Sequence, residues 1–351
     1  MIDMIIGKLK RYMLFVCLSG TLLFCGCSER KIVLTTEFRE NEIFRINDMS
    51  CFTPEMMLYL TTVENQYNEV YGEEIWNHDI DGISFEQRIK DTVLAKVAQI
   101  KVMNLMARDY GLSLSESEKE NVNSEATSFY NSLNDSEKVL INVTLEDVES
   151  IYTEYALACK TYEYIVKDVS DEISDDEARI VTVQHILVKT YGEDASHNRL
   201  DYTKQAKKNA YDLLKGIREK IVSGDAEFEA MAAAYNEDDA VTYSFSRGEM
   251  PTAFEDAAFS LDAGEVSDII ETDSGYHIIK CVSVFDIEQT QNNKIKLYDT
   301  RKNELFEKVY DEYVGTLTKN LNSGLYDSLE FLHNPFVTTS SFFDVDFLTG
   351  L

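Results

Sequence analysis

The fold is decided by the stretch Thr272-Asp273-Ser274-Gly275-Tyr276-His277-Ile278-Ile279, in which a turn leads directly into an apolar strand. Asp, Ser and Gly favour tight turns, and the apolar run that continues to about Phe285 is typical of a strand. A second strand is predicted at about 180–188, where β-branched residues crowd the sequence IVTVQHILV. Because side chains alternate between the faces of a strand, His277 and His185 each share a face with aliphatic neighbours. The sequence therefore predicts two strands that each present a histidine among apolar side chains.

Between these strands the spacing of apolar residues changes to that of helices. Helices are predicted at about 206–221, 228–235 and 253–261. Thr252 and Glu255 have the spacing of a capping box for the third helix, and strand signals return at 267–271. The order β-α-α-β-α-β-β predicts an α+β domain at 178–286, a small antiparallel sheet with surrounding helices.

The segments on either side of this domain are predicted to be helical. Residues 53–172 indicate an all-α segment of four helices, each opened by a recognisable signal. These signals are Thr53 with Pro54, and the capping residues Ser84, Ser115 and Thr144. A further long helix is predicted at 290–325, and the Ser/Thr/Phe-rich tail at 334–351 is expected to be a flexible or client-like end.

The N-terminus has the composition of an export signal. A basic start is followed by an apolar run that is too short to span a bilayer comfortably and ends in Gly26-Cys27. This ending resembles the lipobox of bacterial lipoproteins, which implies a signal peptide at 1–26, lipidation of Cys27 and a tether at 27–52. The protein would then be extracytoplasmic and held at the cell membrane by lipid, although the sequence leaves open which membrane. An uncleaved N-terminal anchor is the alternative.

Charge and cysteine content exclude several classes of function. The chain has 33 Lys and Arg against 63 Asp and Glu, a net charge of −30, which repels phosphate backbones and excludes a nucleic-acid partner. The three cysteines after Cys27 are Cys51, Cys159 and Cys281. Their wide spacing fits neither a disulfide framework nor a metal site, so we expect them in the core. We expect no cofactor and no metal.

The α+β domain resembles the parvulins, a family of peptidyl-prolyl cis-trans isomerases. The matching segments, in order, are 183–188, 245–250, 254–259, 264–267 and 272–279. With its export signal, helical segment and long C-terminal helix, the whole chain resembles the PrsA-type extracytoplasmic foldases and, more distantly, the SurA-type chaperones. The resemblance implies an enzyme that isomerises X-Pro bonds in unfolded or partly folded exported polypeptides. It also implies that the helical segment and the C-terminal helix pack together as a chaperone module.

The resemblance also assigns the site. The catalytic positions fall on His185, Asp238, Ser274 and His277, and the pocket for the proline ring falls on Phe245, Met250 and Phe254. One departure is the interval 239–244, which lacks the glycine-rich stretch that parvulins usually have there and must follow another path.

Two other functions compete with the isomerase. A non-enzymatic holdase chaperone, which uses a parvulin fold only to bind clients, is the alternative that the altered interval keeps open. A hydrolase or redox enzyme has little support, because the chain shows no nucleophile elbow and no Cys-x-x-Cys motif. The sequence leaves open the identity of the clients and whether the chain forms a homodimer.

Overall fold

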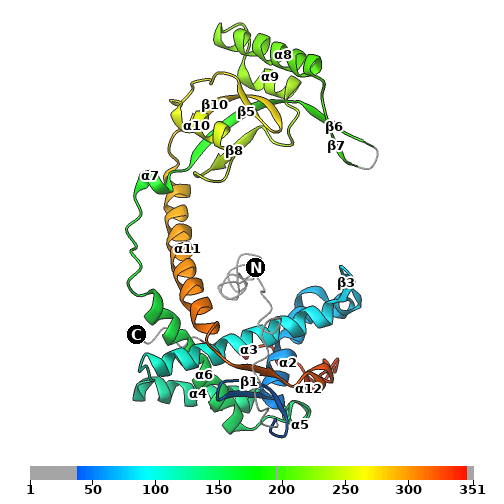
Figure 1. The fold of residues 1–351 in the computed structure, drawn as a ribbon, viewed down its shortest axis with the longest axis vertical. Coiled ribbons are helices and arrows are strands. Elements are labelled where there is room, and N and C mark those ends of the chain that lie inside the picture. The colour runs from blue at the N-terminus through cyan, green and yellow to red at the C-terminus, as the bar shows by residue number, and fades with distance from the viewer. Residues whose placement is uncertain (1–37, 195–196, 346–351) are drawn as a thin grey trace. The chain divides into compact units, whose positions relative to one another are not determined.

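The computed structural model describes residues 38–194 and 197–345, which fall into two compact units. Of the described residues, 38–168 and 304–345 form the helical unit, and 169–194 with 197–303 form the α+β unit (Figure 1). The predicted signal peptide at 1–26, Cys27 and the first part of the tether lie outside the described residues. Within the part of the chain that is described, no helix has the length and apolarity needed to cross a membrane.

The helical unit is built mainly from helices whose starts were predicted. Its helices are α2 (Thr53–Tyr71), η1 (Glu73–Asn77), α3 (Phe85–Asp109), α4 (Glu116–Ser132), α5 (Asp135–Ile141), α6 (Leu145–Val166) and α12 (Ser323–Asp327). Ser84, Ser115 and Thr144 cap α3, α4 and α6 as expected, each accepting a hydrogen bond from a backbone N–H of the first turn. Helix α5 was not predicted, although Asn134 and Glu137 form a capping box at its start.

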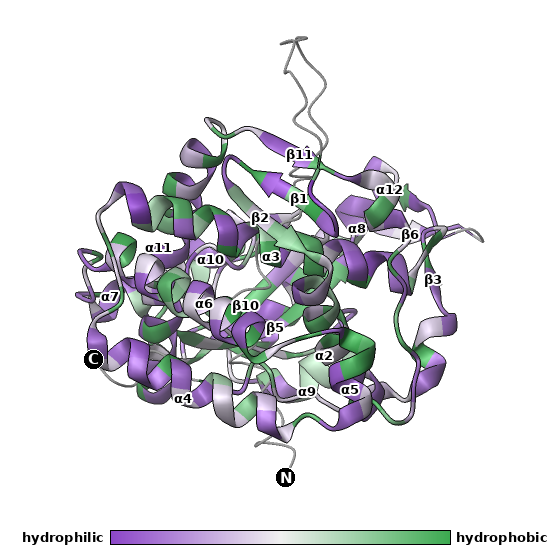
Figure 2. Cartoon of the chain, turned by 90° about the horizontal axis from the view of Figure 1, so that it is seen from below, coloured by the Kyte–Doolittle hydropathy of each residue, from purple (hydrophilic) through white to green (hydrophobic). Residues whose placement is uncertain are grey.

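Short strands complete the helical unit. β1 (Glu42–Ile46) lies between β2 (Met49–Phe52) and β11 (Lys319–Leu321) in an antiparallel sheet, and β3 (Asp79–Ile80) pairs with β4 (Ile83–Ser84). The strand near 42–46 was predicted, whereas the other strands were not. Figure 2 shows hydrophobic and hydrophilic residues mixed along the helices, as expected for elements with one buried and one exposed face.

The C-terminal part of the chain differs from the sequence-based expectation. Helix α11 (Ile287–Val314) begins and ends earlier than predicted. It ends early because Gly315 follows it and Lys319–Leu321 pairs with β1 instead of continuing the helix. The tail is not flexible from 334 to 345: Val337 and Phe342 are buried in the helical unit, at 4% and 1% exposure. Residues 346–351 lie outside the described residues.

The α+β unit has the predicted antiparallel sheet with surrounding helices, so the predicted fold class is confirmed. Its elements are α7 (Asp175–Ala178), β5 (Val181–Lys189), β6 (Tyr191–Glu193), β7 (Arg199–Asp201), α8 (Lys204–Val222), α9 (Phe228–Tyr235), β8 (Thr242–Phe245), α10 (Thr252–Ser260), β9 (Ile270–Thr272) and β10 (Gly275–Ser283). The sheet order is β8-β5-β10-β9. The hairpin β6-β7 was not predicted.

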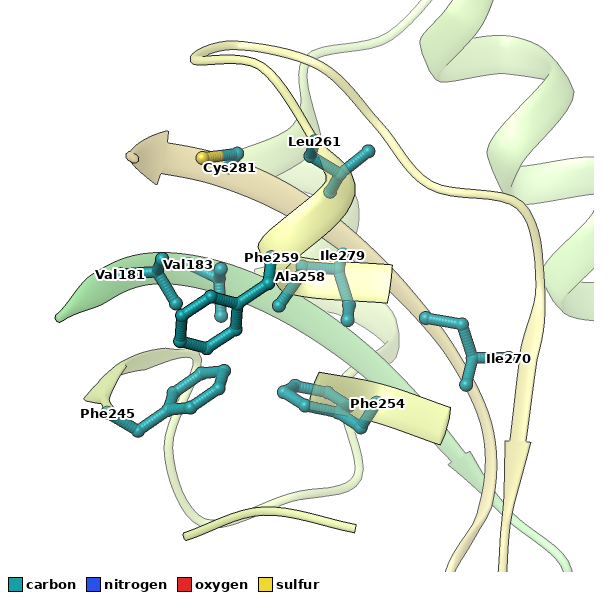
Figure 3. Close-up of a cluster of buried hydrophobic side chains, with 10 residues drawn as sticks. All are labelled: Val181, Val183, Phe245, Phe254, Ala258, Phe259, Leu261, Ile270, Ile279 and Cys281. Atoms are coloured by element: carbon teal, nitrogen blue, oxygen red, sulfur yellow. The ribbon is translucent and has the colours of Figure 1, made fainter. Parts of the chain in front are cut away.

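Each face of this sheet has its own hydrophobic core. Helices α8 and α9 cover one face, where Ile186 of β5 and Ile278 of β10 are buried. The other face holds a cluster that includes Val183, Ile279 and three phenylalanines, shown in Figure 3. His185 and His277 belong to strands β5 and β10 and lie on this second face, because they alternate with Ile186 and Ile278.

Two details of the α+β unit were set by close contacts. The predicted capping box at Thr252 is wrong: Pro251 precedes α10 without a side-chain cap, and the Glu255 carboxylate accepts a hydrogen bond from the N–H of Gly248 instead. Gly275 has φ +144°, and a Cβ atom there would lie 2.3 Å from the carbonyl oxygen of Val188. Only glycine therefore allows β10 to start this close to β5.

Candidate active site

The two strand histidines contact each other inside the sheet face. Their Nδ1 atoms are 3.3 Å apart, and their rings are stacked with centroids 5.6 Å apart. The two residues are 2% and 6% exposed, with His185 the more buried. β10 pairs with β5 so that Ile279 lies opposite His185 and His277 opposite Leu187, which staggers the rings across the pair of strands.

The outer nitrogens of both rings also have partners. His185 Nε2 is 3.1 Å from the carbonyl oxygen of Ala240 and 3.2 Å from Asp238 Oδ2. His277 Nε2 is 2.8 Å from the hydroxyl of Thr272, which itself accepts the N–H of Ser274 at 3.1 Å. All four ring nitrogens are thus occupied.

These partners fix the direction of every hydrogen bond when both rings are neutral. A carbonyl oxygen can only accept, so His185 carries its proton on Nε2 and its Nδ1 accepts. His277 must then donate from Nδ1, and its Nε2 accepts from the Thr272 hydroxyl. The result is a one-way chain from Thr272 through His277 and His185 to Ala240 and Asp238, which holds both rings in one tautomer.

Burial keeps both imidazoles neutral near pH 7. It lowers the pKa of His277 to about 4, with the neighbouring His185 acting in the same direction. The pKa of His185 is also lowered by burial, although the Ala240 carbonyl and the Asp238 carboxylate oppose that effect. The pair is therefore a rigid neutral support rather than an acid–base couple at neutral pH.

Asp238 is the charged group of the site, and a small network holds it. Its Oδ2 accepts a hydrogen bond from the Tyr243 hydroxyl at 3.0 Å, and its side chain is 31% exposed. The side-chain amide of Asn236 donates to the carbonyl oxygens of Asp238 and Ala240, both at 3.1 Å. The carboxylate is thus fixed beside His185 while it still faces solvent.

The interval 239–244 takes the different path that its lack of glycine requires. Its second half forms β8, which pairs with β5 from Thr242 onward, and the N–H of His185 donates to the Val241 carbonyl at 2.8 Å. Ordinary strand geometry therefore replaces the glycine-rich loop expected for the family, and it brings the Ala240 carbonyl to His185.

The predicted proline-pocket residues lie next to the histidines. The Phe254 ring stands nearly perpendicular to both imidazoles, at centroid distances of 5.6 Å from His185 and 5.3 Å from His277. Phe245 lies 5.9 Å from Phe254 in the same cluster, where Figure 3 shows their rings side by side. Met250 packs against the cluster and is only partly buried. Phe245 and Phe254 are buried, so these three side chains form an apolar cluster next to the polar network, with Met250 at its partly exposed edge.

The structure brings most predicted site residues together, with one at the edge. His185 contacts both His277 and Asp238, whereas the Ser274 hydroxyl makes no hydrogen bond among the described residues. Thr272 and Tyr243 complete the network, and the sequence analysis assigned neither of them to the site. The position of Thr272 in the β9-β10 hairpin could have indicated its role. Thr272 lies opposite Gly275, and Gly275 precedes His277 by two residues on the same strand.

Comparisons with known proteins agree with this geometry. Residues 185–283 match the family model described as "Rotamase: PPIC-type PPIASE domain". Peptidyl-prolyl cis-trans isomerase Pin1 of Malus domestica is 36% identical over 118 residues, which are 31% of this chain and 98% of that protein. Foldase protein PrsA of Caldanaerobacter subterraneus subsp. tengcongensis is 26% identical over 253 residues, 70% of this chain and 74% of that protein.

A solved structure of peptidylprolyl isomerase (PrsA) from Bacillus cereus covers 84% of this chain and 94% of its own, at 18% identity and a TM-score of 0.37. The likeness to Pin1 of Malus domestica is closer in sequence, at 36% identity over nearly all of that protein. Because this chain covers nearly all of a relative at that identity, and the matched domain contains both paired histidines, the chain belongs to the parvulin family of peptidyl-prolyl cis-trans isomerases.

Proposed function

We propose that this protein is a foldase that isomerises X-Pro bonds in exported polypeptides at the site formed by His185, His277 and Asp238. The observation that carries the proposal is the one-way hydrogen-bond chain through two buried neutral histidines, with Phe254 against both rings. Such a chain fixes the position of the neighbouring carboxylate and aromatic side chains without itself exchanging protons at neutral pH.

The reaction explains why a rigid site of this kind is useful. Rotation about a peptide bond crosses a barrier of about 18–20 kcal/mol, and no covalent bond is made or broken. The enzyme must therefore bind the twisted amide more tightly than the planar one. As the amide twists, resonance is lost and the carbonyl oxygen gives up negative charge. A fixed carboxylate near that oxygen disfavours the planar state more than the twisted one.

The roles of the remaining residues follow from their positions. Phe245, Met250 and Phe254 hold the proline ring on their apolar surface, and Asp238 lies near the carbonyl that precedes it. His185 and His277 are positioning residues, because they act through Asp238 and Phe254. Ser274, next to Thr272 in the β9-β10 turn, is assigned to the substrate side of the site.

The setting is proposed from the N-terminus and from the relatives. Lipidation of Cys27 after removal of residues 1–26 would hold the enzyme at the outer side of the cell membrane, where it meets exported chains. A relative that is named foldase PrsA and matches 70% of this chain supports that setting. The clients would be unfolded or partly folded polypeptides with X-Pro bonds.

The test is the rate of cis-trans isomerisation of short X-Pro peptides by the chain from residue 28 onward. We expect Asp238→Ala to lower kcat/KM by about 10–100-fold, or roughly 1.4–2.8 kcal/mol, and His277→Ala to lower it similarly. Asp239→Asn is the matched control, because that neighbouring side chain is outside the network, and it should keep full activity.

The variants must retain the circular dichroism spectrum of the parent chain. If the parent chain accelerates no peptide of any sequence, the enzyme proposal fails and the parvulin fold serves only to bind clients. If Asp239→Asn loses as much activity as Asp238→Ala, the assignment of Asp238 is wrong.

A further inference from the structure

The chain's own C-terminal segment, residues 329–345, lies in the helical unit as an extended peptide would lie in a receptor. We call this segment the C-terminal strap. It follows α12 and contains no helix or strand of its own. Its apolar side chains Leu329, Phe331, Val337, Phe342 and Phe343 are each at most 9% exposed. The strap is therefore held by the unit rather than by its own secondary structure.

The helical unit holds the strap by its backbone. Side chains that donate to strap carbonyls are Lys90 to Leu329 at 3.1 Å, Asn134 to Phe336 at 3.0 Å, Asn65 to Thr339 at 2.8 Å, Gln66 to Ser340 at 2.8 Å and Tyr152 to Phe342 at 2.9 Å. Hydrogen bonds of this kind do not depend on the identity of the bound residues. The receptor side is thus built to hold a polypeptide in general.

Two buried carboxylates hold strap N–H groups. Glu64 accepts the N–H of Leu332 at 3.1 Å and of His333 at 2.7 Å, and Glu137 accepts those of Thr338 and Thr339 at 2.7 and 2.8 Å. Both glutamates are 2% exposed. Glu137 also accepts the N–H of Asn134 at 2.7 Å within the helical unit. A buried carboxylate that loses donors is costly, so the strap backbone stabilises both glutamates.

Aromatic pockets supply the selective part of the contact. Phe342 packs against Tyr59, Phe129 and Tyr152, with centroid distances of 5.3, 5.2 and 4.8 Å. Phe331 lies 4.9 Å from Trp76. Phe336, by contrast, is 72% exposed. The pockets therefore select aromatic residues at certain positions of an otherwise arbitrary extended chain.

One side of the strap remains open to solvent. A hollow of about 750 Å³ lies between the strap, from His333 to Ser340, and the end of α2 with Trp76. Polar amides and carboxylates line it, including Asn65 and Asn68. The hollow thus gives an incoming chain access to Asn65, one of the amides that hold the strap, before the strap has left.

We propose that the C-terminal strap is a built-in ligand of a polypeptide-binding groove, and that an extended, aromatic-rich stretch of unfolded client displaces it. This inference rests on the proposed role in handling exported chains. It assigns a client site within the helical unit itself, independent of proline, together with the segment of this chain that competes for it.

The probe is a fluorescently labelled synthetic peptide with the sequence of residues 329–345. Phe342→Ala in the full chain weakens the strap but leaves the groove intact, and we expect this variant to bind the peptide at least about tenfold more tightly than the parent chain. Phe336→Ala is the matched control in the same strap, and its affinity should equal that of the parent. Val337→Ala, a milder change, should give an intermediate affinity even if Phe342→Ala folds poorly.

Two further measurements separate this idea from its competitors. Adding Asn65→Ala and Gln66→Ala to Phe342→Ala should reverse most of the gain, because the peptide loses the same amides. Trp76, the only tryptophan of the chain, contacts Phe331, so its emission should shift to the red when the strap leaves.

Isomerisation of short X-Pro peptides should be the same in all these variants, so the outcome does not depend on the catalytic assignment. If folded Phe342→Ala and Val337→Ala bind the peptide no better than Phe336→Ala, the strap is a permanent part of the fold and the proposal is overturned.

Discussion

The two units use polar side chains in opposite ways. In the α+β unit, His185, His277 and Thr272 bond mainly to one another, so the network is complete before any substrate arrives. In the helical unit, Glu64 and Glu137 bond to the backbone of a distant segment, so their network is complete only while a peptide lies there. The comparison teaches that the first arrangement suits a fixed catalytic surface and the second an exchangeable one.

The largest expected effect compares one buried phenylalanine in each unit. Phe254→Ala should lower the free energy of unfolding of the α+β unit by about 3–5 kcal/mol, since it empties the space beside both histidines. Phe342→Ala should cost the helical unit less, because the strap can leave without unfolding of the helices. Urea unfolding with native-state amide exchange measures both. Equal losses, with protection falling throughout the helices, would show that the strap is as permanent as the core.

The next effect is the dependence of stability on pH. Burial lowers the pKa of His277 from 6.5 to about 4, so the unfolded chain takes up a proton at a higher pH than the folded one. Stability from this group is complete above pH 6.5 and is lost as the pH falls toward 4, by about 3 kcal/mol.

The pH effect is isolated by comparing urea unfolding of the parent chain and His277→Asn between pH 4 and 8. The difference in free energy of unfolding between the two should shrink as the pH falls. The control His197→Asn removes a histidine side chain that is 89% exposed and should leave the profile of the parent unchanged. A constant difference across the range would mean that folding does not lower the pKa of His277.

A smaller effect is expected at the start of the hydrogen-bond chain. Thr272→Val removes the hydroxyl that donates to His277 Nε2 and should cost about 1–3 kcal/mol, because a buried acceptor is left without a donor. Thr272→Ser should restore most of that stability. The control Thr182→Val removes a strand hydroxyl that bonds to Ser244 on the exposed side, and it should change urea unfolding by less than about 0.5 kcal/mol. If Thr272→Ser were as unstable to urea as Thr272→Val, the result would contradict the assignment of the Thr272 hydroxyl as the donor to His277 Nε2.

The smallest effect tests how firmly Asp238 is held. Tyr243→Phe removes one hydrogen bond to a partly exposed carboxylate, so we expect a loss of about 0.5–1 kcal/mol in stability and a two- to threefold drop in kcat/KM. Tyr276→Phe, in β10 on the opposite sheet face, is the control. A loss of activity as large as that of Asp238→Ala would instead mean that the Tyr243 hydroxyl contacts the substrate.

Local chemistry explains what the sequence could predict. Helices α3, α4 and α6 start where Ser84, Ser115 and Thr144 predicted them, because a cap involves residues only three apart. The histidine faces were predictable for the same reason, since alternation along a strand is a local rule. The false capping box at Thr252 shows the limit: Glu255 had a better partner in the turn at Gly248.

Long-range pairing explains what the sequence could not predict. The strand Lys319–Leu321 has no neighbour in its own part of the chain and pairs with β1. The apolar residues of the strap follow neither a helical nor a strand spacing. Its contacts come from helices that are 190 to 274 residues away in the chain, so no local pattern predicts them. At the site, the Ala240 carbonyl became a partner of His185 only through the pairing of β8 with β5.

Gly275 has a consequence for how this sequence can evolve. Its missing side chain takes no part in catalysis, yet any Cβ there would meet the backbone of Val188 and push away the strand that carries His277. In a library randomised at this codon and selected for isomerase activity, glycine alone should survive. Such invariance would resemble that of a catalytic residue, although its origin is purely steric. Survival under selection therefore does not by itself separate the residues that contact the substrate from the glycine that aligns β10 with β5.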